Sequence, residues 1–152
     1  ILDAGGIPCY PILLDDKAGN ITRFESDWEK MDQILKSYKV SCLELIPQRN
    51  SLEKLTEFVH FFLEKNYVIS FGTEHNTLGV FPVTVSVEKD RELSPELKEV
   101  SYRGASVIAA HQYLMARNLK GFVGEDGKAD LENLGYYQDL GHALITAFTS
   151  SN

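Results

Sequence analysis

The chain has 152 residues, which suits one ordinary domain, and its apolar fraction of 43% and charged fraction of 24% exclude disordered and fibrous proteins. The formal charge of −7 argues against a broad electrostatic surface for nucleic acid. No apolar run approaches the roughly 20 residues that a membrane span needs, so we expect no membrane partner.

The chain opens with an apolar strand and an amphipathic helix. Residues 1–6 are typical of the last turn of a helix stopped by glycine, from which we expect a larger protein to continue upstream. The apolar run at 7–14 predicts a buried strand. Ser26, with Glu29 three residues later, forms a capping box that predicts a helix at 27–38.

Two further strands alternate with one more helix. Residues 42–46 predict a second strand, Ser51 can cap a helix with apolar positions between 52 and 63, and 67–71 predict a third strand. The order strand, helix, strand, helix, strand has short connections. It therefore predicts parallel crossover units in an α/β fold.

The second half of the chain is mainly helical. Residues 80–87 could form an extended segment, and a serine followed by proline predicts a long helix at 94–118. A loop with three glycines at 121–128 precedes a final helix at 131–148. We expect these elements to continue the same domain.

Polar residues follow the predicted strands, and parallel α/β sheets gather function at the carboxyl ends of their strands. Glu74, His75 and Asn76 come directly after the third strand. Glu74 could ligate a divalent cation or act as a base, and His75 could do either. Alternatively, Glu74 caps a turn or pairs with Arg49, with no metal. Arg49 follows the second strand and could bind phosphate or carboxylate, or be an ordinary surface arginine.

Several other polar residues favour structural roles. Cys9 and Cys42 both lie in apolar, strand-like runs, which favours buried free thiols over a disulfide and, with them, a reducing, cytoplasmic location. His111 falls on the apolar stripe of a helix, a position more typical of a hydrogen-bonded core residue than of a ligand. Glu44 lies inside the second strand and faces either a polar barrel interior or solvent.

Three segments resemble the polymerase-and-histidinol-phosphatase (PHP) family. The sequence AGGIPCYP at 4–11 is similar to the family's passage from a helix end through two glycines into a strand closing in Ala-His-Pro. LELIP at 43–47 resembles its Gly-Ile-Glu-Val strand, and FGTEHN at 71–76 resembles its Gly-Ser-Asp-x-His motif. The three segments occur in the family's order and cover about half of the chain.

The resemblance implies a partial, distorted, TIM-like α/β barrel with parallel strands at 1–77, followed by C-terminal helices at 78–152. It implies zinc, manganese or iron as a cofactor and a phosphorylated small molecule or a phosphodiester as substrate, hydrolysed by metal-activated water. The family's His-rich first motifs are absent from this chain. We therefore expect an N-terminal part of the same protein to supply further ligands, and this chain alone to be inactive.

Three residues depart from the family's pattern. Tyr10 and Asn76 stand where the family has histidines, and Glu74 stands where it has aspartate. Glutamate keeps a hard oxygen ligand, whereas tyrosine and asparagine bind zinc-like ions poorly. We predict Glu74 and His75 as catalytic residues and metal ligands, Asn76 as a supporting ligand, and Arg49 and Tyr10 as substrate-binding residues. The alternative is a non-catalytic PHP-like binding or interaction module.

Overall fold

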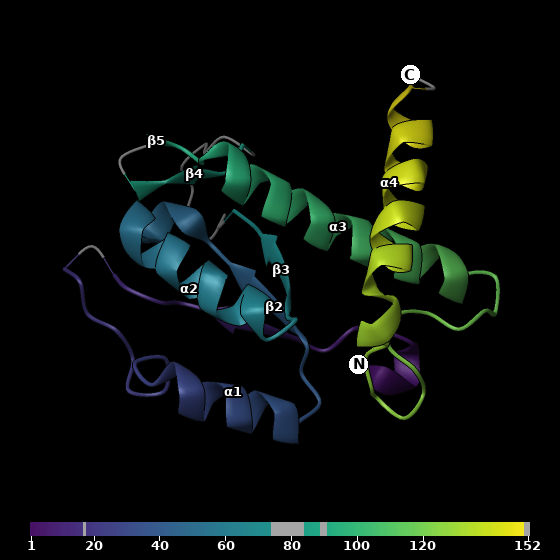
Figure 1. Cartoon of the computed structure of the whole chain (residues 1–152), viewed down its shortest axis with the longest axis horizontal. Coiled ribbons are helices and arrows are strands. Elements are labelled where there is room, and N and C mark those ends of the chain that lie inside the picture. The colour runs from purple at the N-terminus through teal and green to yellow at the C-terminus, as the bar shows by residue number, and fades with distance from the viewer. Residues whose placement is uncertain (17, 74–83, 89–90, 151–152) are drawn as a thin grey trace.

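The computed structural model describes residues 1–16, 18–73, 84–88 and 91–150 (Figure 1). Its elements, in chain order, are η1 Leu2–Ala4, β1 Cys9–Ile12, α1 Trp28–Ser37, β2 Cys42–Leu45, η2 Pro47–Arg49, α2 Leu52–Glu64, β3 Val68–Phe71, β4 Ser86–Val87, β5 Arg91–Glu92, α3 Pro95–Met115, η4 Leu131–Asn133 and α4 Leu134–Ser150. The molecule is a mixed helix-and-strand protein with helices at its C-terminal end.

The three long strands form one parallel sheet in the order β1-β2-β3. Cys9 is opposite Cys42, and Cys42 is opposite Val68, so the strands begin level with one another. This confirms the predicted α/β fold with parallel strands. Within the described residues the sheet is open, and β4 and β5 form a separate antiparallel pair.

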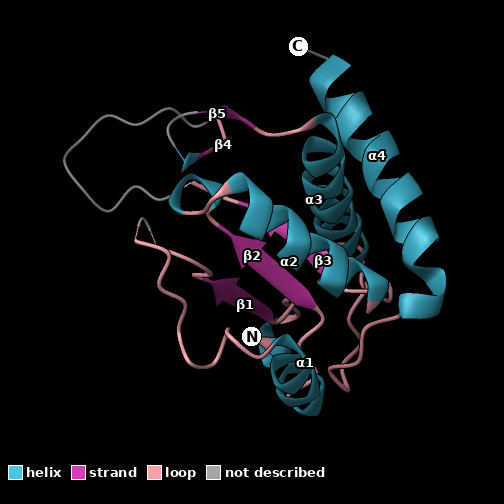
Figure 2. Cartoon of the chain, turned by 60° about the vertical axis from the view of Figure 1, so that its left-hand side comes forward, coloured by secondary structure: helices cyan, strands magenta, loops and turns pink. Residues whose placement is uncertain are grey.

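Helices α1 and α2 cover one face of the sheet. Side chains alternate between the faces of a strand, so Leu43 and Leu45 of β2 and Ile69 of β3 share a face. They form one core with buried residues of both crossover helices, among them Met31 and Phe58. Figure 2 shows α2 lying across this face.

The second face is covered unequally. Cys42 and Val68 pack with Val107 and Ala110 of α3, which lies against β3. At Gly104 the helix approaches so closely that a Cβ would overlap the backbone of Ile69. Helix α4 crosses α3 on the outside (Figure 1), and α3 packs mainly on β3.

Two of the three helix caps predicted from the sequence are confirmed. Ser51 caps α2 by accepting from the Lys54 amide, and Ser94 caps α3. The capping box predicted at Ser26 is wrong, because the Ser26 hydroxyl donates to the Arg23 carbonyl in the preceding turn. The Asp27 carboxylate caps α1 instead.

Two further predictions need correction or restriction. Cys42 is buried as expected, but the prediction is wrong for Cys9, which is exposed beside a cavity on the second face of the sheet. The extended segment predicted at 80–87 lies partly outside the described residues, and its end forms β4. None of the described helices combines the length and apolarity that crossing a membrane requires.

Two glycines of α4 test the packing of the C-terminal helices. A Cβ at Gly141 would overlap the Ser106 carbonyl of α3, whereas a Cβ at Gly135 meets nothing within 4 Å. We predict that Gly141→Ala lowers the free energy of unfolding by about 1–3 kcal/mol through overpacking. Gly135→Ala, the matched control, leaves it unchanged or raises it by up to about 1 kcal/mol. Urea denaturation followed by circular dichroism measures both, and equal effects would contradict the close helix contact.

Candidate functional site

The carboxyl ends of the three parallel strands lie at one edge of the sheet. Ile12 of β1 is opposite Leu45 of β2, which is opposite Phe71 of β3. In parallel α/β sheets this edge is where ligand sites form. The segments that leave β1 and β2 are described except for residue 17, and they bring together a set of buried polar groups.

A buried glutamate holds the chain where it leaves β1. The backbone amides of Leu13 and Leu14 donate to the two carboxylate oxygens of Glu25 at 3.0 and 2.8 Å. Leu14 has a φ of 56°, a left-handed conformation that is uncommon for a leucine. Glu25 is only 1% exposed, so its carboxylate serves as an internal acceptor for two amides that have left the strand ladder.

Asn50 joins the ends of β1 and β2. Its side-chain nitrogen donates to the Leu13 carbonyl at 2.9 Å and to the Asp15 carbonyl at 2.8 Å. Both amide hydrogens are therefore used, which fixes the orientation of the side chain. Asn50 is completely buried, so these two bonds tie the two strand ends together away from water.

Asp15 is the acidic group of this edge. One carboxylate oxygen, Oδ2, accepts from the Ser51 hydroxyl at 2.9 Å. The other, Oδ1, is buried without a hydrogen-bond partner among the described residues, and the same holds for Oδ1 of Asn50. Buried acceptors are normally satisfied, so these two oxygens are suited to receive a donor or a hard cation.

Arg49 brings positive charge to the same edge. It ends η2 directly after β2 and is half-buried. The pKa of the exposed Asp16 carboxyl is lowered mainly by hydrogen bonds from Asn20 and also by the charge of Arg49. The guanidinium therefore lies within electrostatic reach of the segment that leaves β1.

Tyr10 lies in the body of β1, on the face that α1 and α2 cover. Its ring packs on Phe24 with centroids 5.5 Å apart, and the side chain is half-buried. Burial raises the pKa of the phenol, and the charge of Glu25 adds to the shift. Tyr10 thus lies within the sheet near Glu25, whereas Arg49 lies at the carboxyl edge of the sheet.

The remaining predicted site residues, Glu74, His75 and Asn76, lie outside the described residues, so their roles stay predictions. Within the described part of the chain, no three His, Cys, Asp or Glu residues gather as metal ligands. The described edge contributes hard oxygen from Asp15 and Asn50. This ligand type fits manganese or magnesium better than zinc.

His111 has the structural role that its position on the apolar stripe predicts. Its Nε2 atom is 2.8 Å from the Gly5 carbonyl, and Nδ1 accepts from the Val123 amide at 3.4 Å. These contacts place the ring proton on Nε2 and leave neither nitrogen for a ligand. Glu44 is exposed on the face of the sheet opposite α1 and α2.

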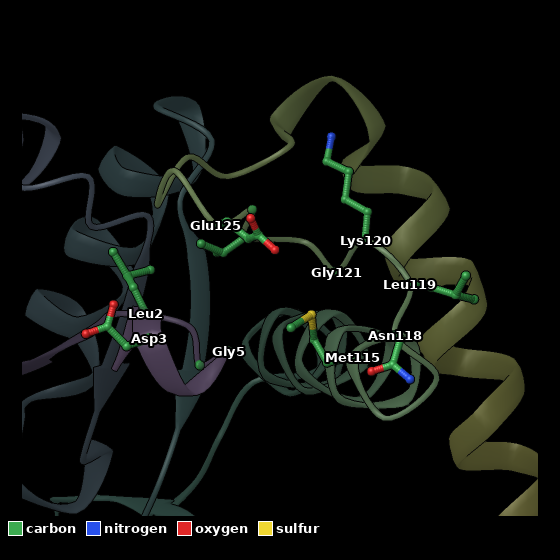
Figure 3. Close-up of a pocket in the computed structure, with 12 residues that line it drawn as sticks. Leu2, Asp3, Gly5, Met115, Asn118, Leu119, Lys120, Gly121 and Glu125 are labelled. Carbon is green, nitrogen blue, oxygen red and sulfur yellow. The ribbon is translucent and has the colours of Figure 1, made fainter.

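A cavity of about 490 Å³ lies at the other end of the strands, between the N-terminal turn and the loop after α3 (Figure 3). Leu2, Asp3, Met115 and Glu125 line it, and Lys120 stands at its rim. The Lys120 ammonium forms an ion pair with the Asp130 carboxylate at 3.2 Å. This cavity is separate from the polar edge, and its charged groups do not converge in Figure 3.

The chain matches no protein-family model, no curated protein and no solved structure. The site is therefore argued from its own residues.

Sequence reasoning overlooked three residues of the edge. Asp15 was visible as the first polar residue after an apolar strand, and Asn50 as a neighbour of Arg49, but neither pattern indicates burial. Glu25 gave no sign of its role, because its partners Leu13 and Leu14 are 12 and 11 residues away across a loop.

We predict that Glu25→Gln lowers the free energy of unfolding by about 1–3 kcal/mol. The substitution replaces one acceptor oxygen with an amide group that faces a backbone donor. The control is Glu29→Gln, which removes only an exposed ion pair with Lys65 at 3.1 Å and should change stability by less than about 1 kcal/mol. Chemical denaturation compares the two, and a Glu25→Gln protein as stable as the parent would show that the carboxylate does not hold this strand end.

Proposed function

We propose that the chain is part of a PHP-like metal-dependent phosphoesterase whose substrate binds at the carboxyl edge of the sheet. The observation that carries the proposal is the pair of buried oxygens, Asp15 Oδ1 and Asn50 Oδ1, left without described partners at that edge. Arg49 adds a cation nearby. A carboxylate oxygen and an amide oxygen beside an arginine suit a metal ion and the phosphate that it binds.

The strand order supports the partial-barrel part of the proposal. Each strand is added on the same side of the previous one, and both crossover helices pack on the same face. An unreversed strand order with both crossover helices on one face is typical of α/β barrels, whereas doubly wound sheets reverse direction. Helix α3, which packs on the opposite face, follows the three parallel strands and is not one of their crossover helices. Free thiols persist in reducing compartments, so we include a cytoplasmic location in the proposal.

Each residue has a distinct task in this proposal. Glu74, His75 and Asn76 hold the metal, with Glu74 and His75 also available to move a proton, and residues from a preceding part of the same protein complete the ligand set. A bound divalent cation would neutralise phosphate charge and supply activated water. Arg49 binds phosphate oxygens through its planar fork of donors. Asp15 adds a hard oxygen to the rim of the site.

The metal requirement can be tested on the full-length natural protein. We predict stoichiometric zinc, manganese or iron by elemental analysis, and hydrolysis of bis(p-nitrophenyl) phosphate that chelators abolish. Glu74→Gln should lose both the metal and the activity, because an amide is a much weaker ligand than a carboxylate. Glu64→Gln, an exposed position on α2, should retain both. Metal-free phosphate binding in every variant would indicate the non-catalytic binding module instead.

The role of Arg49 gives a separate prediction. Arg49→Ala should raise KM for the same substrate about 10- to 100-fold with little change in kcat, as expected for the loss of charge-assisted hydrogen bonds to phosphate. The KM of Arg49→Lys should lie between those of the parent protein and Arg49→Ala, since lysine keeps the charge but lacks the planar fork of donors. Arg103→Ala, which breaks only an exposed pair with Glu99, serves as the control. An unchanged KM in Arg49→Ala would remove this residue from the site.

A further inference from the structure

The two cysteines of the chain are direct neighbours in the sheet. Cys9 of β1 and Cys42 of β2 are register partners on adjacent parallel strands, and both side chains emerge on the face opposite α1 and α2. Adjacent strands lie about 4.8 Å apart, which is within the Cα separation that a disulfide spans. Both cysteines are free thiols, and the register of the two strands places them within reach of a disulfide.

The two thiols differ in their access to solvent. Cys9 is exposed, whereas Cys42 is 1% exposed beneath α3. A cavity of about 490 Å³ opens onto both, with Glu44, Ser70 and Met115 among its lining residues. His111 also lines the cavity, but its two ring nitrogens are engaged by Gly5 and Val123. A small reagent can therefore reach Cys9 from solvent, and Cys42 only from the side of Cys9.

The surroundings also make the two thiols chemically unequal. The Cys42 thiol hydrogen-bonds to the Cys9 sulfur and lowers the pKa of Cys9, against the opposing effects of burial and of the Glu44 charge. The same hydrogen bond, together with burial, raises the pKa of Cys42. The thiolate is the nucleophilic form of cysteine. Cys9, with the lowered pKa, is therefore the attacking group, and Cys42 remains a protonated thiol.

We propose that Cys9 is a peroxide-reactive thiol and that Cys42 resolves its oxidised form as a reversible disulfide between β1 and β2. The Cys9 thiolate attacks one oxygen of hydrogen peroxide, the O–O bond breaks, and the departing hydroxide takes a proton and leaves as water. Cys9 is then a sulfenic acid. The Cys42 sulfur attacks it, the S–O bond breaks, and the hydroxyl leaves as water with the Cys42 proton. Two thiols are oxidised by two electrons, and one peroxide is reduced to two waters.

This inference does not depend on the metal site. The disulfide lies at the amino ends of β1 and β2, whereas Asp15 and Asn50 follow their carboxyl ends. Cytosolic disulfides are mostly transient and redox-sensing, and an exposed one is readily reduced. A thiol reductant should therefore restore both cysteines without unfolding the chain.

The test uses the full chain, treated with hydrogen peroxide in slight excess, denatured in N-ethylmaleimide and measured by intact mass. Because the chain has only two cysteines, the products are unambiguous. We expect the reduced protein to take two maleimides, and the oxidised protein to take none and to weigh about 2 Da less than the reduced chain. Dithiothreitol should return both sites. In the untreated native protein, iodoacetamide should modify Cys9 at least about tenfold faster than Cys42.

Two variants separate the roles of the cysteines. Cys42→Ser should stop at a sulfenic acid on Cys9 that dimedone traps, and Cys9→Ser should leave Cys42 unreacted at the same peroxide dose. Disulfide-linked dimers through Cys9, or a sulfinic acid on Cys9 with Cys42 still open to maleimide, would overturn the proposal. Equal peroxide reactivity of the two single variants would overturn it as well.

Discussion

The internal acceptor that Glu25 provides is the constraint on which the carboxyl edge of the sheet depends. When the chain leaves β1, the amides of Leu13 and Leu14 lose the strand ladder, and at the buried Leu14 an unpaired amide would be costly. The carboxylate replaces the ladder at both positions. With that turn fixed, the carbonyls of Leu13 and Asp15 face Asn50, and the ends of β1 and β2 become one polar unit.

The two faces of the sheet have different tasks. One face is closed by α1 and α2 around an apolar core that includes Leu43 and Phe58. On the other face α3 covers β3 and the amino end of β2, with Gly104 permitting its close approach. The second face of β1 is left accessible, which is why Cys9 reaches solvent beside its buried neighbour. The proposed chemistry at the edge and the proposed thiol chemistry therefore use different parts of one scaffold.

Local patterns predicted the elements and their order. Apolar runs and helical periodicity located β1 to β3 and both crossover helices, and Ser51 and Ser94 were correct caps because a cap is a contact over three residues. One local pattern, the capping box at Ser26, was wrong. Asp27 rather than Ser26 caps α1, since the Ser26 hydroxyl is already committed to Arg23.

Burial was the least predictable property of the candidate site. The alternation of β1 does not reveal that a cavity separates its second face from α3, so Cys9 could not be recognised as exposed. Nothing in the sequence around Glu25 or Asn50 distinguishes them from surface residues, because their burial follows from the packing of segments far apart in the chain. Arg49 could be placed at the edge because it lies in the short segment between β2 and α2. The roles of Glu74, His75 and Asn76 are predicted from the sequence alone.

The Ser51 hydroxyl connects this edge to the start of α2. It donates to Asp15 and accepts from the Lys54 amide, so one oxygen serves both the strand end and the first helical turn. Unwinding of the first turn of α2 would break the hydrogen bond from Ser51 to Asp15. Movement of Asp15 away from Ser51 would in turn weaken the cap of α2. The amides of Leu14 and Lys54 should consequently exchange with deuterium as members of one cooperative opening unit, although 40 residues of sequence separate them.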